Sequence, residues 1–515
     1  MNRRGLQLRE LLCDLQPLGV EGDDGVSIRN LATDSRRVQP GDLFVALVGE
    51  HVDGHRFLEQ AAGRGAVAAV VERALPRGRL PALVRVERTR TALARAAVRL
   101  HDAPSRAVEL IGITGTKGKT TVAFLLESVL RAAGGRPGVI GTLGARFGQR
   151  QLPTEHTTPE APELQARLAE MRDAGATHVA MEVSSHALEL ERTRGTDFRA
   201  GVFTNLGRDH LDFHGDPARY AAAKRLLFSR ELAESRARDK VAIVNLDDPH
   251  APLMIDGFAG RVLSFGFREE ADVRPVEVEE RGLAGARLRL SFPGGIQEVI
   301  CPLPGRHNLY NFLAAFACGL ALGLPPAAVS AGLAGAPPVP GRLERVPAAA
   351  GPSVFVDYAH TPEALEAVMA TLRPLCRGRL WVVFGCGGDR DGGKRPLMGA
   401  VAARGADRVV VTSDNPRSED PIAIIEAILP GLRQAGGREG TWLEAGSGEA
   451  GVFVIEPDRR QAIQRTVALA NDADVVLIAG KGHEDYQILG AVRTHFDDRE
   501  EAQKALEQKG SALRS

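Results

Sequence analysis

VELIGITGTKGKTT, residues 108–121, is the stretch of this sequence that decides the fold. Its apolar run at residues 110–113 predicts a buried strand, residues 115–120 predict a tight glycine loop, and apolar residues at helical spacing follow. A strand, a glycine loop and a helix in this order form a phosphate cradle, because backbone N–H groups converge on an anion at the helix N-terminus. Lys119 can reach the terminal phosphates of a nucleotide, and the Thr120 hydroxyl can bind Mg²⁺.

The loop is a shortened form of the general P-loop. That pattern has a glycine five residues before the position of Gly118, where this chain has Ile113. The sequence therefore predicts phosphate binding and leaves the reaction open, since a kinase, a GTPase switch and an ATP-driven ligase could all begin with such a loop.

The composition of the whole chain limits the possible partners. With 65 basic and 65 acidic residues the net charge is zero, so nothing indicates general attraction to nucleic acid or to a membrane surface. The five cysteines show no paired spacing, which disfavours a zinc site or a disulfide framework and fits a reducing compartment. No apolar run approaches the length of a membrane span. We expect a cytoplasmic protein without a membrane span or a nucleic-acid partner.

The 515 residues are too many for one core, and three α/β domains are predicted. Residues 1–105 alternate short β-like runs with alanine-rich helical stretches. Residues 106–338 begin with the P-loop and alternate strands and helices, as in a parallel sheet covered on both faces, with a more β-rich, antiparallel passage at 261–303. Proline-rich residues 336–341 are typical of a linker, and residues 339–515 alternate again, as in a dinucleotide-fold relative.

Polar residues at the ends of the predicted strands carry the candidate chemistry. The strand at 177–183 ends at Glu182, and the strand at 200–204 leads to His210. Because the carboxyl ends of parallel strands share one edge of a sheet, both side chains could reach a Mg²⁺ held by Thr120. Taken alone, each is more typical of a hydrogen-bonded structural group.

The third domain contains a candidate amino-acid pocket. Asp357 follows a strand and could accept the ribose hydroxyls of ATP. Arg390 and Arg417 could form planar forks for a carboxylate, whereas Asp414 and Glu484 could hold an ammonium group. The same residues are also compatible with an ordinary charged surface.

Eight motifs in order resemble the Mur ligase family over nearly the whole chain. The resemblance is closest to the type, MurE, that adds meso-diaminopimelate to the D-glutamate of UDP-MurNAc-L-Ala-D-Glu in peptidoglycan precursor synthesis. The motifs are GTKGKTT (115–121), TTP (157–159), MEVSSH (181–186), TNLGRDHLDFHG (204–215), GRHNLYN (305–311), DYAHTP (357–362), DNPR (414–417) and GKGHE (480–484).

The resemblance implies a uridine-nucleotide domain, a central ATPase domain with a P-loop sheet and a C-terminal Rossmann-like domain. It implies binding of the UDP-linked substrate by Thr33, Ser35, Glu50, His51, Val52, Thr157, Thr158, Ser184 and Arg192. It implies binding of ATP by Gly115, Thr116, Lys117, Gly118, Lys119, Thr120, Thr121, Asn308, Arg342 and Asp357. It implies binding of diaminopimelate by Arg390, Asp414, Asn415, Pro416, Arg417, Gly480 and Glu484.

Lys224 is interpreted differently by pattern and by resemblance. By pattern alone it is a solvated lysine in a predicted helix at 217–227, but it matches the carbamylated lysine (N6-carboxylysine) of the family. The implied Mg²⁺ ligands are Thr120, Glu182, His210 and the carbamate of Lys224, and the implied catalytic residues are Lys119, Lys224 and His210.

The implied reaction is activation of the D-glutamyl γ-carboxylate by ATP to an acyl phosphate, which the amine of diaminopimelate then attacks. Closure of the third domain over the second would bring Arg342 and Asp357 onto ATP. Lysine-adding relatives typically lack the arginine at the position of Arg417, so diaminopimelate is predicted. The L-lysine-adding ligase and an ATP-binding switch without ligase activity are the alternatives. A folate-polyglutamate ligase would share the P-loop, but the N-terminal domain and the DNPR motif argue against it. We expect a monomer.

Overall fold

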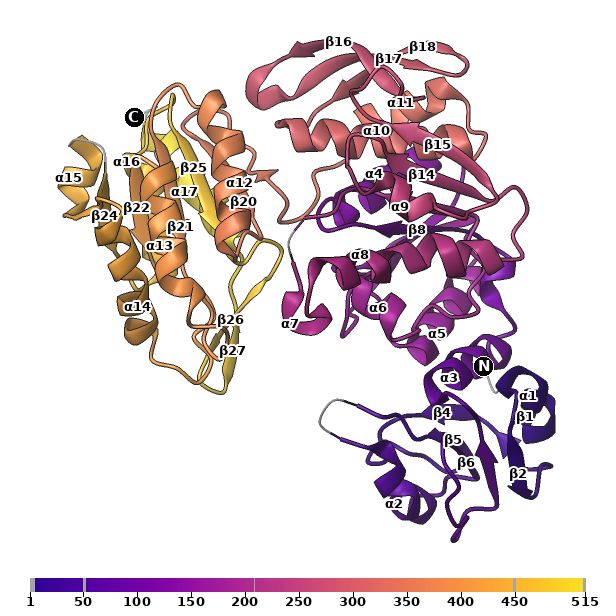
Figure 1. Ribbon diagram of the computed structural model, residues 1–515. Helices are drawn as coiled ribbons and strands as arrows, with labels where there is room; N and C mark the ends of the chain where they lie inside the picture. Colours follow the sequence, from indigo (N-terminus) through magenta and orange to yellow (C-terminus); the bar gives the residue numbers. More distant parts are fainter. Residues whose placement is uncertain (1–4, 50–51, 208, 448–450, 513–515) are drawn as a thin grey trace. The chain divides into compact units, whose positions relative to one another are not determined.

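The computed structural model describes residues 5–49, 52–207, 209–447 and 451–512 of the chain (Figure 1). The chain divides into two compact units. The first unit comprises Met1–Glu279, Arg287–Cys301 and His307–Ala336, and the second comprises Glu280–Ala286, Pro302–Arg306 and Pro337–Ser515.

The first unit begins with a five-stranded sheet in the order β2-β7-β6-β5-β4. Strands β4 to β7 are parallel to their neighbours, and β2 is an antiparallel edge strand. The strands are β2 (Gly19–Gly22), β4 (Asn30–Ala32), β5 (Asp42–Val45), β6 (Ala68–Val71) and β7 (Ala82–Arg85), with a two-stranded sheet of β1 (Leu6–Gln7) and β3 (Ser27–Ile28). The helices here are α1 (Leu8–Leu15), α2 (Leu58–Gly63) and α3 (Thr89–Leu100), with 3₁₀ turns η1 (Gly54–Phe57) and η2 (Pro104–Arg106).

The P-loop belongs to an eight-stranded sheet in the order β11-β10-β9-β12-β8-β13-β14-β15. The six strands from β9 to β15 in this order are parallel, and β10 and β11 extend the sheet as antiparallel strands. The strands are β8 (Glu109–Thr114), β9 (Pro137–Gly141), β10 (Gly144–Phe147), β11 (Arg150–Leu152), β12 (His178–Glu182), β13 (Ala200–Phe203), β14 (Val241–Asn245) and β15 (Arg261–Phe265).

The strand and helix predicted around the P-loop are confirmed. Strand β8 is followed by α4 (Lys119–Ala132), whose N-cap Gly118 has a φ of 89°. The apolar stripe of α4 is buried, because Val122, Leu126 and Val129 are completely inaccessible to solvent. The chain turns at Gly134 with a φ of 83°, a conformation that glycine adopts without a steric penalty.

Further helices accompany the strands of the first unit. They are α5 (Ala161–Asp173), α6 (Ser185–Glu189), α7 (Leu211–His214), α8 (Pro217–Leu226), α9 (Ala251–Ile255), α10 (Arg306–Ala321) and α11 (Pro326–Ala334). Helix α8 continues into the π-helical turn η3 (Leu227–Leu232).

The prediction of antiparallel strands across residues 261–303 is wrong at its beginning. Strand β15 pairs in parallel with β14 and completes the P-loop sheet. The remaining residues form a separate three-stranded sheet of β16 (Arg274–Glu280), β17 (Ala286–Phe292) and β18 (Gly295–Cys301), with the 3₁₀ turn η4 (Gly282–Ala284). Strand β15 (RVLSF) is the edge strand of this sheet, with Arg261 and Val262 exposed, so it lacks the continuous apolar run that is typical of a strand buried on both faces.

The second unit has a seven-stranded sheet in the order β19-β20-β25-β21-β22-β24-β23, parallel except for β19. The strands are β19 (Glu344–Arg345), β20 (Ser353–Asp357), β21 (Leu380–Phe384), β22 (Arg408–Val411), β23 (Arg438–Glu439), β24 (Val452–Ile455) and β25 (Val475–Ala479), with a separate hairpin of β26 (Tyr486–Leu489) and β27 (Val492–His495). The helices are α12 (Pro362–Leu372), α13 (Lys394–Gly405), α14 (Pro421–Gln434), α15 (Trp442–Ser447), α16 (Arg459–Leu469) and α17 (Asp498–Ala512), with the 3₁₀ turn η5 (Arg373–Leu375).

The predicted α/β fold class with parallel sheets is confirmed. The domain boundaries 1–105, 106–338 and 339–515 stay a prediction. In the part of the chain that the structure describes, every helix is too short or too polar to cross a membrane.

Candidate active site

The P-loop lies at the carboxyl end of β8, between the carboxyl ends of β12 and β13. The chain passes from β8 to one side of the sheet for β9 and β12 and to the other for β13, so the loop occupies a topological switch point. Gly115 is required here, because a Cβ on it would lie 1.9 Å from Thr204 Oγ1. The Lys119 ammonium donates to the carbonyl oxygens of Gly115, at 2.8 Å, and Thr116, at 3.0 Å.

The other residues of the loop are fixed by the segment that follows β13. Asn205 accepts from the backbone N–H of Thr116 at its carbonyl oxygen (2.8 Å) and from that of Lys117 at Oδ1 (3.0 Å). Helix α10 reaches the same loop, because a Cβ on Gly118 would lie 2.4 Å from Asn311 Oδ1. Asn311 Nδ2 donates to Oδ1 of the predicted ATP ligand Asn308 at 3.1 Å. Asn308 is therefore near the cradle, as expected for a nucleotide contact.

Glu182 lies next to the first turn of α4 and is 1% exposed. Its Oε2 accepts from Thr120 Oγ1 at 3.0 Å and from Thr142 Oγ1 at 3.2 Å, and its Oε1 accepts from the Thr142 backbone N–H at 2.9 Å. The structure thus brings the predicted pair Thr120 and Glu182 together. Thr142 was missed, because it follows β9 in a polar loop without a motif of its own.

Lys224 is buried on α8, and the interpretation as a solvated lysine is wrong. Its side chain is 1% exposed, its Nζ donates to the carbonyl oxygen of Gly115 at 2.9 Å, and this nitrogen lies 4.3 Å from the ring centroid of Tyr220. Burial, together with the positive charge of Lys119, lowers the pKa of Lys224 well below its ordinary value. The neutral form of the Lys224 amine is thereby favoured next to the Gly115 carbonyl of the P-loop.

His210 lies beside these groups in a left-handed backbone conformation, with a φ of 52°. Its ring meets that of His186 edge-on, with 4.8 Å between the centroids. Burial lowers the pKa of His210. The charge of Lys119 acts in the same direction, whereas Asp209 raises this pKa. Burial also lowers the pKa of His186, to about 4.

These residues fit a magnesium ion in their chemistry. Among the residues that the structure describes, no three His, Cys, Asp or Glu side chains form a ready metal cluster. The Thr120 hydroxyl and the Glu182 carboxylate share one hydrogen bond, however, and both are oxygen donors of the kind that Mg²⁺ prefers. A carbamate on Lys224 would place a further carboxylate near the Gly115 carbonyl of the same loop.

Four predicted substrate contacts form one connected group beside Glu182. Thr157 Oγ1 lies 3.2 Å from Thr142 Oγ1. Thr158 Oγ1 donates to the Glu182 carbonyl oxygen at 2.9 Å and accepts from the Ser184 backbone N–H at 3.0 Å. Arg192 is 8% exposed and its Nη1 donates to the Thr158 carbonyl oxygen at 3.0 Å.

Among the predicted contacts to the UDP end, Thr33 and Ser35 follow strand β4 of the first sheet and Val52 follows strand β5. Ser35 is buried and its Oγ donates to Gln60 Oε1 at 2.7 Å, whereas Thr33 and Val52 are exposed. The predicted contacts Glu50 and His51 lie outside the described residues.

In the second unit, the predicted ATP contacts Arg342 and Asp357 are near each other. Asp357 Oδ2 accepts from the backbone N–H of Leu343 at 2.6 Å, and the Arg342 guanidinium lies 5.4 Å from the ring centroid of Tyr358. The structure therefore groups these two residues around the end of β20.

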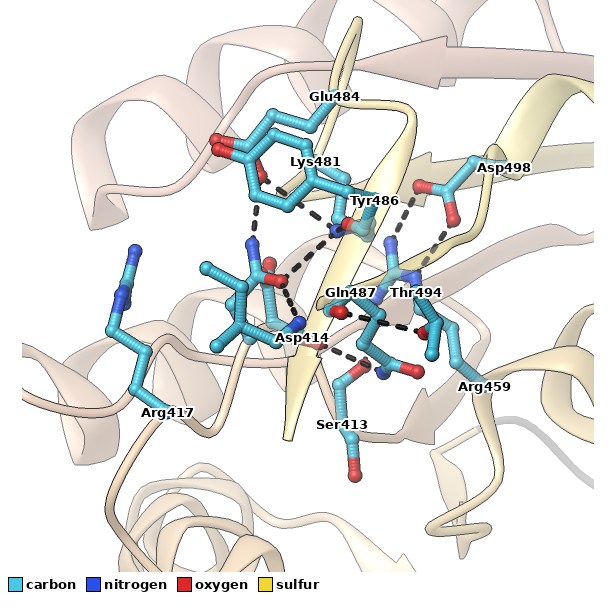
Figure 2. A network of polar contacts seen from close by, with 12 residues as sticks. Ser413, Asp414, Arg417, Arg459, Lys481, Glu484, Tyr486, Gln487, Thr494 and Asp498 are labelled. Atoms are coloured by element: carbon cyan, nitrogen blue, oxygen red, sulfur yellow. Dashed lines mark hydrogen bonds and ion pairs between the residues drawn. The ribbon is translucent and has the colours of Figure 1, made fainter. Parts of the chain in front are cut away.

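The predicted amino-acid pocket is assembled from two loops of the second unit, one after β22 and one after β25 (Figure 2). Asn415 Nδ2 donates to Glu484 Oε2 at 2.8 Å. A Cβ on Gly480 would lie 2.5 Å from Asp414 Oδ2, so glycine is needed where the loops meet. Burial raises the pKa of Glu484, although Lys481 opposes this.

The guanidinium of Arg417 and the aliphatic stem of Arg390 lie close to one residue of the loop after β21. A Cβ on Gly387 would be 3.0 Å from Arg417 Nη1 and 3.8 Å from Arg390 Cγ. Arg417 follows Pro416, has a φ of 54°, and its Nη1 donates to the Gly388 carbonyl oxygen at 2.7 Å.

The hairpin β26–β27 and Lys481 were not predicted as parts of this pocket. The hairpin is bound to the loop of Arg417, since the Arg417 N–H donates to the Ile488 carbonyl oxygen at 3.1 Å and the Ile488 N–H donates to Asn415 Oδ1 at 2.9 Å. Lys481 is completely buried and donates to the carbonyl oxygen of Tyr486. The GKGHE motif contains this lysine, but nothing in the sequence indicates that it turns inward.

Three protein-family models match successive parts of this chain. The Mur ligase family, catalytic domain, matches residues 27–102; the Mur ligase middle domain matches residues 113–319; and the Mur ligase, glutamate ligase domain, matches residues 341–482.

The chain is also similar to named proteins over almost its full length. It is 44% identical over 510 residues to the UDP-N-acetylmuramoyl-L-alanyl-D-glutamate–2,6-diaminopimelate ligase of Geobacter metallireducens, covering 98% of this chain and 99% of that protein. It is 43% identical over 507 residues to the ligase of the same name from Geobacillus kaustophilus, covering 98% of this chain and all of that protein. A solved structure with this ligase name aligns at a TM-score of 0.69 with 33% identity, covering 98% of this chain and 99% of the other.

Proposed function

We propose that this chain, which belongs to the Mur ligase family, is the ATP-dependent ligase that joins diaminopimelate to the D-glutamate of UDP-MurNAc-L-Ala-D-Glu. The observation that carries this proposal is the meeting of two loops, in which Asn415, the residue after Asp414, donates to Glu484 and Asp414 lies against Gly480. Arg417 and Arg390 both lie near Gly387 of a third loop. Such an enzyme forms a precursor of peptidoglycan, and we place it in the cytoplasm.

The reaction we propose has two steps. The D-glutamyl γ-carboxylate attacks the γ-phosphorus of ATP, which forms an acyl phosphate and releases ADP. The neutral amine of diaminopimelate then attacks the acyl carbon, the C–N bond forms, phosphate leaves and the amine loses a proton. A free carboxylate is a poor electrophile, so the first step supplies the leaving group that the second step needs.

The residues of the P-loop act on the charges in the first step. The backbone N–H groups of the cradle and the Lys119 ammonium neutralise the γ-phosphate, which would otherwise repel the attacking carboxylate. We infer that Thr120, Glu182, His210 and a carbamylated Lys224 hold Mg²⁺ here, where the ion would withdraw charge from the phosphates. Thr157, Thr158, Ser184 and Arg192 would bind the peptide end of the substrate, because Thr158 bonds to Glu182 and the other three connect to Glu182 through Thr158 or Thr142.

The remaining roles follow from the family resemblance. We assign Thr33, Ser35, Glu50, His51 and Val52 to the uridine nucleotide. We assign Asn308, Arg342 and Asp357 to ATP. The division of the chain at residues 105 and 338 into nucleotide-sugar, ATP and amino-acid domains is part of the same proposal.

The choice of diaminopimelate over lysine rests on the group at the far end of the side chain. Diaminopimelate carries a carboxylate there that lysine lacks, and a guanidinium fork binds a carboxylate through two parallel hydrogen bonds. The left-handed backbone conformation of Arg417 and its pairing with Leu489 of the hairpin fix the position of the residue that carries this guanidinium. Asp414 and Glu484 offer charges of the opposite sign for an ammonium group.

Arg417→Ala tests this choice. We expect kcat/KM for diaminopimelate to fall by about 100-fold, since an ion pair in a partly desolvated pocket is lost, and kcat/KM for L-lysine to change little. Steady-state phosphate release with each amino acid measures both values. Arg433→Ala is the control, because Arg433 lies on α14 and pairs with Glu439. Unchanged discrimination against lysine in Arg417→Ala would refute the role of Arg417.

The L-lysine-adding ligase remains the second candidate within the family. A switch that uses ATP only to change shape is the candidate from another class. It predicts ATP turnover that does not depend on an amino acid.

A further inference from the structure

Arg459 is a completely buried charged side chain, and the proposed reaction assigns it no contact with a substrate. It is the first residue of α16, and both its side chain and that of Asp498, the first residue of α17, have 0% exposure. Arg459 Nε donates to Asp498 Oδ1 at 2.7 Å and Arg459 Nη2 donates to Asp498 Oδ2 at 2.7 Å (Figure 2). This is the bidentate geometry in which an arginine–carboxylate pair is most strongly held.

The remaining N–H groups of Arg459 bind the backbone of both loops of the amino-acid pocket. Nη1 donates at 3.2 Å to the carbonyl oxygen of Ser413, the residue before Asp414. Nη2 donates at 3.0 Å to the carbonyl oxygen of Ala479, the residue before Gly480. One guanidinium thus joins the carboxyl ends of β22 and β25.

Ser413 also connects this group of hydrogen bonds to the carboxyl end of a third strand, β24. Its Oγ donates at 2.8 Å to the carbonyl oxygen of Pro457, two residues before Arg459. The ends of β22, β24 and β25 are therefore fixed relative to one another by hydrogen bonds that are all buried or partly buried. A buried carbonyl without a donor is energetically unfavourable, so removal of the guanidinium favours movement of the loops toward other donors.

We propose that Arg459, held by Asp498, is a positioning residue for the amino-acid substrate. It sets the spacing between the loop of Asp414 and the loop of Glu484, and it acts through the carbonyl oxygens of Ser413 and Ala479 rather than by touching the substrate. This inference rests on the proposed function of the same pocket. Lysine cannot replace Arg459, because one ammonium does not offer the planar array of donors that reaches a carboxylate and two carbonyls.

Two variants of the full-length protein test this role. Arg459→Lys keeps a positive charge beside Asp498 but loses the fork. The double variant Arg459→Met with Asp498→Leu removes both charges and leaves an apolar pair of similar volume, which buried ion pairs often tolerate. Arg460→Met is the matched control, since Arg460 is the next residue of α16, is half exposed and pairs with Glu501. Tryptophan fluorescence during thermal unfolding checks the fold, because Trp381 is buried in the sheet of the second unit.

The KM values for diaminopimelate, ATP and the UDP-linked dipeptide are measured for each variant. We expect both Arg459 variants to raise the KM for diaminopimelate about 10- to 100-fold, as displacements of a binding group by about 1 Å do, with the other two KM values and the control unchanged.

Two results would overturn the inference. One is an unchanged KM for diaminopimelate in the folded variants. The other is an equal rise of all three KM values, or failure of both Arg459 variants to fold, which would assign Arg459 to general stability. A wild-type protein without diaminopimelate-dependent phosphate release would contradict the proposed function instead, so the two failures are distinguishable.

Discussion

Lys224 shows how the surroundings of a single residue change its chemistry. An ordinary lysine is protonated at neutral pH and does not react with CO₂, whereas a neutral amine adds CO₂ to give a carbamate and releases a proton. Burial and the charge of Lys119 both lower the pKa of Lys224, so its surroundings favour the reactive form. The position of its Nζ, 2.9 Å from the Gly115 carbonyl oxygen, places such a carbamate at the nucleotide cradle.

Replacement of Lys224 by alanine removes this group. We expect Lys224→Ala to lower kcat by about 100- to 1,000-fold, as loss of one preorganised electrostatic group does, and added formate or acetate to restore part of the activity. Phosphate release with and without the carboxylic acid measures the rescue. Arg225→Ala is the control on the same helix, where Arg225 pairs with Asp256. Full activity of Lys224→Ala would contradict the role of Lys224, and a lack of rescue would contradict the carbamate.

At the scale of an element, Asp53 organises the loop that follows β5 and leads into η1. Asp53 Oδ1 accepts from the backbone N–H of His55 at 3.0 Å and lies 2.7 Å from His55 Nδ1, and its other oxygen pairs with Arg73. His55 Nε2 in turn accepts from the Glu72 backbone N–H at 2.9 Å, at the end of β6. This chain of contacts fixes the segment next to Val52, a predicted contact to the uridine nucleotide.

Asp53→Ala is expected to destabilise the first sheet by about 1 kcal/mol, the usual cost of losing an N-cap. Burial opposes ionisation of Asp53, but the hydrogen bonds from His55 and Arg73 lower its pKa to about 2. Because this pKa is depressed, the contribution of Asp53 is complete above the unfolded pKa of about 4 and is lost as the pH falls toward 2. The stability difference between wild type and variant should therefore shrink across this range.

Far-UV circular dichroism in urea at several pH values measures this difference. Tryptophan fluorescence would not, because Trp381 and Trp442 both belong to the second unit. Asp24→Ala is the control, since the Asp24 side chain is exposed and pairs with the exposed side chain of Arg9. A difference between wild type and Asp53→Ala that stays constant down to pH 2 would contradict the assigned pKa.

Elements formed by local patterns could be predicted, and groups formed by distant contacts could not. The strands β8, β12 and β13 lie where strands are predicted, at residues 110–113, 177–183 and 200–204, because each contains a short apolar run. Arg459 was missed, since its partners Ala479, Asp498 and Ser413 are 20, 39 and 46 residues away. Lys224 was misread by pattern for the same reason, and only the resemblance to a family indicated its role.

At the scale of the whole molecule, we expect a single chain in solution. Some large exposed apolar side chains among the described residues, such as Leu18, Leu397 and Leu443, belong to different segments, and scattered exposures of this kind are normal for monomers. The three-stranded sheet carries four more, Val276 and Val278 on β16 and Ile296 and Ile300 on β18. We expect light scattering to give a mass of 55.0 kDa, the mass of one chain. A mass of two chains that persists on dilution would contradict a monomer.

The most direct measurement is phosphate release by the purified protein with ATP, Mg²⁺ and UDP-MurNAc-L-Ala-D-Glu, with meso-diaminopimelate or L-lysine added in parallel. We expect phosphate and a UDP-linked tripeptide only with diaminopimelate, because Arg417 and Arg390 offer forks for its second carboxylate. Preference for lysine would contradict the role of Arg417, and phosphate release that is indifferent to both amino acids would contradict the ligase itself.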